Sequence, residues 1–223
     1  MLGILYIVAT PIGNLEDITL RAVRVLEEVD LIAAEDTRHT RKLLTHFKIH
    51  TKLTSFFEAN EREKAHSIIK ALESGSDVAL VSDAGTPCIS DPGYPLLKTA
   101  IETGIKIVPI PGPSALACAI SAAGLPTDRF TFIGFLPDKL GKRRTKICEL
   151  KDFEHTLVFY VSKWKGEAVI ADCLQILGDR NACLCRELTK MHEEFIRGTL
   201  SDILTSIQNN PPKGEMTLVI AAK

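Results

Sequence analysis

Three short loops rich in proline and glycine are the segments whose residue types and spacing best suit chemistry. They are Thr10-Pro11-Ile12-Gly13-Asn14, Ser82-Asp83-Ala84-Gly85-Thr86-Pro87 and Pro111-Gly112-Pro113-Ser114. Each follows a predicted strand, and ligands of open α/β sheets bind outside the carboxyl ends of the strands. Glycine lets the backbone approach a ligand closely, and proline holds a loop still. We therefore expect the three loops to form one shared binding edge.

Ordinary turn formation is the alternative explanation, because proline and glycine make turns in most proteins. That explanation is preferable for any single loop, whereas three such loops at successive strand ends favour a site. Motifs that the chain lacks narrow the kind of site. It has no G-x-G-x-x-G, no G-x-x-x-x-G-K-[ST] and no G-x-S-x-G, so dinucleotide binding, P-loop nucleotide hydrolysis and a serine nucleophile elbow are not supported.

The elements that must position these loops alternate between strand and helix in the first half of the chain. Strands are expected at Ile4–Ala9, Leu31–Ala34, Lys52–Phe56, Val78–Ser82 and Lys106–Ile110. The helices expected between them are Thr19–Glu28, Thr37–His46, Asn60–Ser74 and Tyr94–Thr103. Asn60 and Glu63 have the spacing of a capping box. This alternation predicts an α/β fold with a largely parallel sheet.

The second half of the chain has more antiparallel character. Its expected strands are Phe130–Gly134, Thr156–Val161, Ala182–Glu187 and Met216–Ala221, with a further candidate at Glu194–Gly198. Its expected helices are Ser114–Ala123, Arg143–Leu150, Gly166–Leu177 and Ser201–Gln208. A helix cannot run through the prolines of residues 109–113. We therefore expect an N-terminal α/β domain at residues 1–111 and a C-terminal α/β domain at residues 112–223.

Composition indicates an ordinary soluble globular protein. The 223 residues are 45% hydrophobic and 25% charged, with a formal net charge of -1, so any nucleic-acid contact must come from local patches. None of the six cysteines forms a C-x-x-C pair, and Cys183 and Cys185 have no partner at zinc-ligand spacing. We therefore expect no metal and reduced, buried thiols. The chain begins with an apolar strand rather than a basic leader, so we expect a cytoplasmic protein.

Together these segments resemble a known family. The matching stretches are Leu5–Leu15, Ala34–Arg38, Ser82–Pro87 with Ile89–Gly93, Pro109–Ser114, Glu187–Lys190 with Glu193, and Arg197–Leu200. They are similar to the ribosomal RNA methyltransferases of the tetrapyrrole methylase superfamily, and the resemblance spans nearly the whole chain. It implies a class III methyltransferase fold, in which two α/β domains form a homodimeric enzyme with a cofactor cleft between them.

The resemblance also implies a cofactor, a substrate and a set of contacts. The cofactor is S-adenosylmethionine, and the reaction is methylation of a ribose 2′-hydroxyl on a cytidine of 16S ribosomal RNA. Matching positions of relatives contact the cofactor at Pro11, Ile12, Asp83, Gly85, Thr86, Pro87, Ile89, Ser114, Ala115, Tyr160, Met216 and Thr217.

A sulfonium methyl group is already activated, so the protein must mainly align the ribose oxygen with it. A base that accepts the hydroxyl proton helps, as does a cation beside the developing oxyanion. The candidates are Glu187, Lys190 and Glu193 after one strand, and Asp36 and Arg38, together with Glu35, after another. Each of them is equally explained as a solvated surface group, and Asp36 also as a plain helix cap.

Two basic clusters suit a phosphate backbone. The denser cluster consists of Lys139, Lys142, Arg143, Arg144 and Lys146, and the other of Arg38, Arg41, Lys42 and Lys48. The first one favours RNA contact, because it is concentrated in one loop beside a glycine. The alternative is a solvated face, which is usual for runs of charge.

The chain departs from the family where relatives carry Glu-Ser-Pro-His-Arg, because it has Val161-Ser162-Lys163-Trp164-Lys165 there. The stretch Ser55–Glu61 is also altered, and both changes bear on the RNA substrate more than on the cofactor. Two alternatives therefore stay open. One is a methylase of a tetrapyrrole or another small molecule on the same fold, and the other is a catalytically silent RNA-binding relative.

Overall fold

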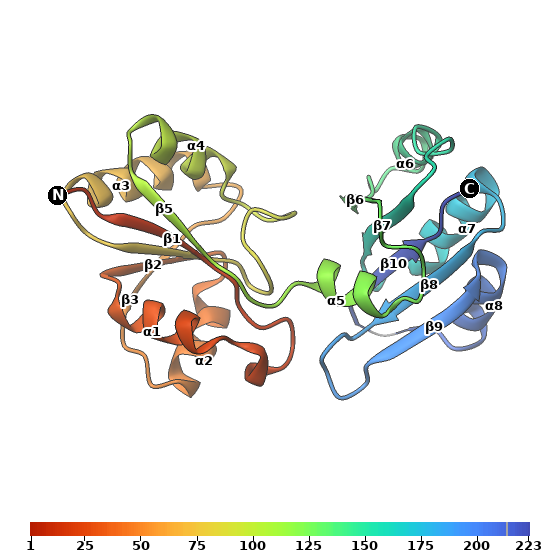
Figure 1. Cartoon of the computed structure of the whole chain (residues 1–223), viewed down its shortest axis with the longest axis horizontal. Helices are drawn as coiled ribbons and strands as arrows, with labels where there is room; N and C mark the ends of the chain where they lie inside the picture. The colour runs from red at the N-terminus through yellow and green to blue at the C-terminus, as the bar shows by residue number, and fades with distance from the viewer. Residues whose placement is uncertain (213) are drawn as a thin grey trace. The chain divides into compact units, whose positions relative to one another are not determined.

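The computed structural model describes residues 1–212 and 214–223 and divides the chain into two compact units, residues 1–114 and residues 115–223 (Figure 1). The division after Ser114 lies beyond the boundary expected after Pro111. The reason is that this segment still bonds within the first unit, where the Pro113 carbonyl accepts a hydrogen bond from the Thr86 hydroxyl at 3.2 Å.

The first unit is built on a parallel sheet of five strands in the order β3-β2-β4-β1-β5. The strands are β1 (Ile4–Val8), β2 (Leu31–Ala34), β3 (Lys52–Ser55), β4 (Val78–Val81) and β5 (Lys106–Ile110). All four residues of the central strand β4 are buried, as expected of a strand covered on both faces. The loops after β1, β4 and β5 consequently emerge at the same edge from neighbouring strands.

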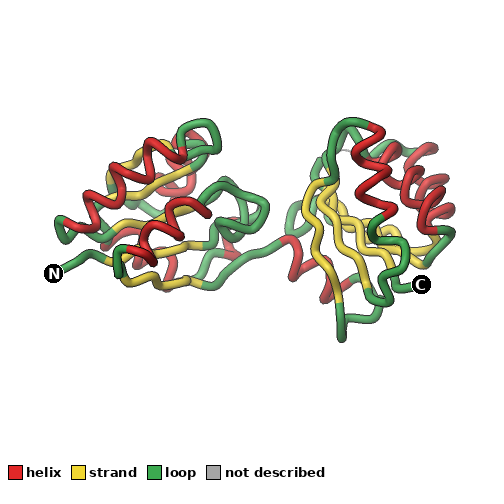
Figure 2. The backbone as a smooth tube through the Cα atoms, turned by 90° about the horizontal axis from the view of Figure 1, so that it is seen from above, coloured by secondary structure: helices red, strands yellow, loops and turns green. Residues whose placement is uncertain are grey.

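Helices cover both faces of this sheet (Figure 2). They are α1 (Leu20–Glu28), α2 (Thr37–His46), α3 (Glu61–Glu73) and α4 (Tyr94–Glu102), with a short 3-10 helix η1 at Leu15–Asp17. Alternate strand residues separate into two cores, so that Ile7 packs with α3 and α4 while Val8 packs with α1 and α2. This period of two is the signature of a strand between two apolar layers.

Helix caps agree with the sequence at one position and disagree at another. The Asp36 carboxylate accepts a hydrogen bond from the Arg38 amide at 2.8 Å and caps α2, which confirms its expected role as a cap. The capping box expected at Asn60 is wrong. The side-chain oxygen of Asn60 accepts a hydrogen bond from the Phe57 amide at 2.8 Å. Because this oxygen is already used in the preceding turn, Asn60 makes no side-chain cap bond to α3.

The second unit contains a mixed sheet in the order β6-β7-β10-β8-β9, in which only β6 and β7 run parallel. The strands are β6 (Phe130–Phe135), β7 (Thr156–Val161), β8 (Asn181–Arg186), β9 (Glu194–Thr199) and β10 (Met216–Ile220). The expected antiparallel character is confirmed, and so is the candidate strand at β9.

Three helices pack on one face of the second sheet, while a fourth contacts β10 (Figure 2). The three are α6 (Leu140–Cys148), α7 (Gly166–Leu177) and α8 (Leu200–Asn209), and the fourth is α5 (Ala115–Ala122). The core between the sheet and α6, α7 and α8 includes Phe159 and Leu218, both fully buried. Within the described residues, no helix is both long and apolar enough to cross a membrane.

Candidate functional site

The loops after β1 and β4 are joined by backbone hydrogen bonds. The amides of Thr10 and Gly85 each donate to the other residue's carbonyl at 2.9 Å. The buried hydroxyl of Thr10 adds a bond to the Ser82 carbonyl at 3.1 Å. Since every one of these groups is a backbone atom or a buried hydroxyl, the two loops hold a fixed mutual position.

The loop after β5 is attached to the same structure. Thr86 donates its hydroxyl to the Pro113 carbonyl at 3.2 Å, and Gly112 passes so near β1 that an added Cβ would lie 3.0 Å from the Ala9 side chain. The three proline-glycine loops therefore form one connected edge at the carboxyl ends of β1, β4 and β5, as the sequence predicts. We call this structure the loop edge.

Gly85 of the loop edge has a backbone conformation that favours glycine. Its φ is +91°, in the region that disfavours side chains. An added Cβ would lie 3.4 Å from Ile12 Cγ2 and 3.7 Å from the Pro113 carbonyl oxygen. Backbone without a side chain at a strand end is what a closely bound ligand requires.

The other expected cofactor residues of the first unit lie on or beside the loop edge. Ile12 is buried beneath Gly85, Pro87 is buried, and Ile89 is 37% exposed. Ser114 ends the first unit and Ala115 begins α5. The structure thus brings the first-unit residues together along one edge of the parallel sheet.

Carboxylates gather beside the loop edge, after β2 and β4. Asp83 accepts a hydrogen bond from the Asp36 amide at 2.8 Å, which ties the start of α2 to the loop after β4. Burial, assisted by Asp83 and Asp91, raises the pKa of Glu35. Burial also raises the pKa of Asp91. Sequence reasoning did not single out Asp91, although it stands in the matched stretch Ile89–Gly93.

Asp36 and Arg38 are bound to each other. The Arg38 guanidinium lies 3.1 Å from an Asp36 carboxylate oxygen. Hydrogen bonds from the Arg38 side chain and amide lower the pKa of Asp36 to about 2. A carboxylate with so low a pKa is a poor acceptor for an alcohol proton, so its electrostatics favour the capping role over the expected catalytic one.

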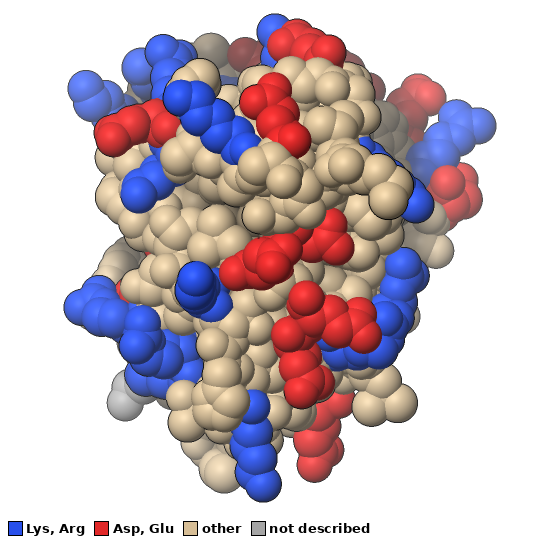
Figure 3. Space-filling model, turned by 90° about the vertical axis from the view of Figure 1, so that its left-hand side faces the viewer, with Lys and Arg blue, Asp and Glu red and all other residues tan. Residues whose placement is uncertain are grey.

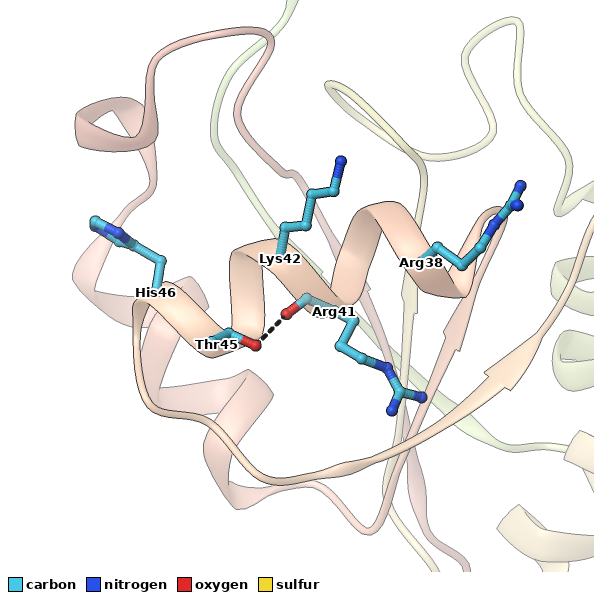
Figure 4. A pocket seen from close by; sticks show the side chains of 5 residues that line it. All are labelled: Arg38, Arg41, Lys42, Thr45 and His46. Carbon is cyan, nitrogen blue, oxygen red and sulfur yellow. Dashed lines mark hydrogen bonds between the residues drawn. The ribbon is translucent and has the colours of Figure 1, made fainter.

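The outer face of α2 is basic (Figure 4). A shallow hollow there is lined by Arg38, Arg41, Lys42, Thr45 and His46. These positions repeat at intervals of three and four and so share one helix face. Lys48, expected in the same cluster, lies beyond the end of α2. Figure 3 shows both positive and negative side chains on the face it views.

In the second unit, the expected cofactor residues lie on two neighbouring strands. Thr217 on β10 is the register partner of Tyr160 on β7, and Met216 is the partner of Val161. Met216 packs into the core with α6, α7 and α8. Because side chains alternate along a strand, Thr217 and Tyr160 share the opposite face. A contact from Met216 to a ligand would therefore use its backbone.

Glu187, Lys190 and Glu193 meet in the turn between β8 and β9. Lys190 Nζ donates to Glu187 at 2.9 Å and to Glu215 at 3.1 Å, and Glu193 accepts from the Thr189 amide at 2.7 Å. Burial alone raises the pKa of Glu187, but hydrogen bonds from Lys190 and the Glu215 amide outweigh it and lower the pKa. Three of the expected catalytic residues therefore share this turn, where Glu187 and Lys190 pair with each other and Glu193 is held by the Thr189 amide.

The basic cluster expected to bind RNA is divided by α6. Arg143 is buried, and its Nε lies 2.7 Å from Asp172 on α7. Arg144 bonds to the other oxygen of Asp172 at 2.7 Å. We therefore remove Arg143 from the expected RNA contacts, because a buried, paired guanidinium cannot reach a phosphate. Lys139 and Lys142 are exposed, and Lys146 is exposed but paired with Glu149 at 2.7 Å.

The sequence of this chain matches a known protein family. Residues 4–204 match the model of the Tetrapyrrole (Corrin/Porphyrin) Methylases. The chain belongs to the tetrapyrrole methylase family. The resemblance drawn from the sequence is thereby confirmed, together with the expected fold class of two α/β domains and the expectation of a methyltransferase.

Relatives within the family share about half of the sequence. A Halalkalibacterium halodurans protein named ribosomal RNA small subunit methyltransferase I is 51% identical over 98% of this chain and 75% of its own length. A Thermotoga maritima protein of the same name is 45% identical over 100% of both chains.

Solved structures of the family's fold are more distant in sequence. Diphthine synthase superimposes with a TM-score of 0.77 at 15% identity, covering 99% of this chain and 90% of its own. Uroporphyrin-III-C-methyltransferase from Thermus thermophilus gives a TM-score of 0.66 at 20% identity, covering 100% and 93%. These likenesses establish the fold alone.

Proposed function

We propose that this protein transfers a methyl group from S-adenosylmethionine to the RNA of the small ribosomal subunit. The observation that carries the proposal is the identity of 45% to 51% with relatives named ribosomal RNA small subunit methyltransferase I, over 98% to 100% of the chain. The acceptor that we propose is the ribose 2′-hydroxyl of a cytidine.

The loop edge is suited to hold the methyl donor. Gly85 offers backbone without a side chain, and the bonds of Thr10 and Thr86 keep the loops in place. Bound there, the cofactor supplies an activated methyl group. What remains for the protein is orientation, which is where a preorganised site contributes most to rate. Tyr160 and Thr217 are proposed cofactor contacts from the second unit.

Removal of the hydroxyl proton calls for a group with a raised proton affinity. Glu35 meets this requirement better than Asp36, because burial and neighbouring carboxylates raise its pKa whereas Arg38 lowers that of Asp36. We propose Glu35 as the proton acceptor.

Lys190 is held between two carboxylates, and we propose that it stabilises the turn between β8 and β9.

Phosphate contacts are proposed for the exposed cations that have no carboxylate partner among the described residues. On α2 these are Arg41 and Lys42, and beside α6 they are Lys139 and Lys142. Exposed lysine and arginine bind a phosphate backbone mainly by releasing counterions.

The direct test is transfer of tritiated methyl groups from S-adenosylmethionine to purified 30S subunits, compared with uroporphyrinogen as the acceptor. We expect label in the 16S RNA at a ribose, mapped by resistance of the adjoining phosphodiester to alkali. Label in the pigment alone would overturn the proposal in favour of a small-molecule methylase. Cofactor binding by calorimetry without transfer to either acceptor would favour the catalytically silent alternative.

A further inference from the structure

Two large aromatic side chains of the second unit stand in solvent. Trp164 is 83% exposed and Phe135 is 60% exposed. Leaving rings of this size in water forgoes the burial that normally stabilises them. Such exposure suits a surface that becomes covered by a partner.

The two rings lie at or just after the carboxyl ends of β6 and β7, which are neighbouring parallel strands. Phe135 ends β6 and is the register partner of Tyr160 on the parallel strand β7, with ring centroids 5.5 Å apart. Trp164 follows in the loop after β7. An ion pair between Lys165 of that loop and Asp138 of the loop after β6 joins the two loops. We name the two exposed rings, Phe135 and Trp164, the aromatic platform.

Lysines lie beside Trp164 and in the segment that follows Phe135. Lys163 Nζ lies 4.6 Å from the centroid of the Trp164 ring, and Lys139 and Lys142 are exposed on the neighbouring loop and helix. Asp138 of the loop after β6 pairs with Lys165, and Glu149 at the end of α6 pairs with Lys146. The platform thus combines flat rings with an excess of positive charge.

We propose that the aromatic platform stacks unpaired bases of RNA while the surrounding lysines hold the phosphates. This proposal rests on the proposed function and names how that substrate is gripped. Rings interleaved with cations are the pattern of single-strand binding, in which stacking accepts any base. A second copy of this chain fits less well, because it would set lysines against lysines. Duplex RNA keeps its base faces covered.

The chain carries its own reporter, because Trp164 is its only tryptophan. Intrinsic fluorescence of the full chain is titrated with an unpaired oligocytidylate of about ten nucleotides, within the usual site size, and with a duplex RNA of equal length. We expect the single strand to quench the emission and the duplex to do so at least tenfold more weakly. Equal quenching by both would overturn the proposal.

Variants of the chain then distinguish a loss of base stacking from a loss of charge and from a loss of folding. Affinity for the oligonucleotide, measured by anisotropy of a label on the RNA, should fall about tenfold in Trp164→Ala and within threefold in Trp164→Phe, because one stacked base is lost or kept. Met191→Ala is the matched control, since Met191 is 93% exposed in the same unit, and it should bind as the parent does. Thermal melting checks that each variant is folded. Equal affinity of Trp164→Ala and the parent would refute the stacking role.

The methyl-transfer assay distinguishes this proposal from the function on which it rests. Trp164→Ala should raise the KM for 30S subunits about tenfold and leave kcat unchanged, as removal of uniform binding does. An unchanged KM in an active enzyme overturns the platform and leaves the function standing. Quenching by single-stranded RNA without any transfer to 30S subunits supports the platform and overturns the function.

Discussion

The backbone of Gly85 is a point at which the loop edge tolerates little change. Its φ of +91° strains any residue with a side chain, and a branched side chain would extend beyond a Cβ that already contacts Ile12. We predict that Gly85→Val weakens binding of S-adenosylmethionine at least tenfold, about 1.4 kcal/mol, measured by calorimetry. Gly104→Val is the control, because Gly104 has a φ of +72° with nothing within 4 Å of its added Cβ. An equal loss in both variants would mean that strain, rather than occupancy of the site, is responsible.

Glu35 gives a prediction about pH. Burial, with Asp83 and Asp91, raises its pKa in the folded chain above the ordinary 4.5, so the folded state holds the proton more tightly than the unfolded state does. Stability is therefore lost as pH rises through and above 4.5. We predict that Glu35→Gln melts at a higher temperature than the parent at neutral pH and that the difference disappears well below the ordinary pKa.

The matched control for Glu35→Gln is Glu58→Gln, because Glu58 is exposed and its substitution should leave the melting temperature unchanged at either pH. If Glu35 accepts the substrate proton, the stabilised variant should also show a reduced kcat, a common trade between stability and activity. A variant that is neither stabilised nor slowed would remove Glu35 from the proposed site.

Helices and strands were predictable from the sequence where the spacing of apolar residues and the residues typical of element ends indicated the same bounds. The bounds of α2 and α7 and of β2, β5 and β7 are those expected from the sequence. The start of α6 was not, because its N-cap residue Lys139 makes no side-chain cap bond and Gly141 in its first turn is typical of a loop. Lys142, Arg143 and Arg144 look alike in sequence, and only the packing of α6 on α7 separates the exposed lysine from the buried arginine.

The ion group that joins α6 to α7 provides a prediction at this scale. Asp172 is almost fully buried between Arg143 and Arg144, with side-chain exposures of 4%, 8% and 44%. We predict that Asp172→Asn costs about 3–5 kcal/mol in urea unfolding, because it leaves the buried guanidinium uncompensated. Replacing Asp172 and Arg143 together by leucine should cost much less. Asp152→Asn is the control, since that side chain is 87% exposed. Equal costs in the single and double variants would contradict this account.

At the scale of the whole molecule, charge decides how an almost neutral protein could hold RNA. The net charge is -1, so attraction to RNA must come from local basic patches rather than from a global field. The patches that we propose are the basic face of α2 and the lysines beside α6. The composition of the chain predicts this need for local patches. It does not indicate which cations lack a carboxylate partner, because ion pairs between different helices and strands form only in the folded chain.

The salt dependence of RNA binding counts the cations that touch phosphate. Each contact contributes roughly 0.7–0.9 to the slope of log affinity against log salt. We predict that Arg41→Ala with Lys42→Ala, and separately Lys139→Ala with Lys142→Ala, lower the slope for 30S binding by about 1.5. The control removes Lys52 and Lys106, which begin β3 and β5 at the opposite edge of the parallel sheet. Net charge changes equally in all three pairs, so an unchanged slope in the control shows that position matters. A slope lowered equally in all three would mean that RNA responds only to total charge, and neither surface would then be a binding site.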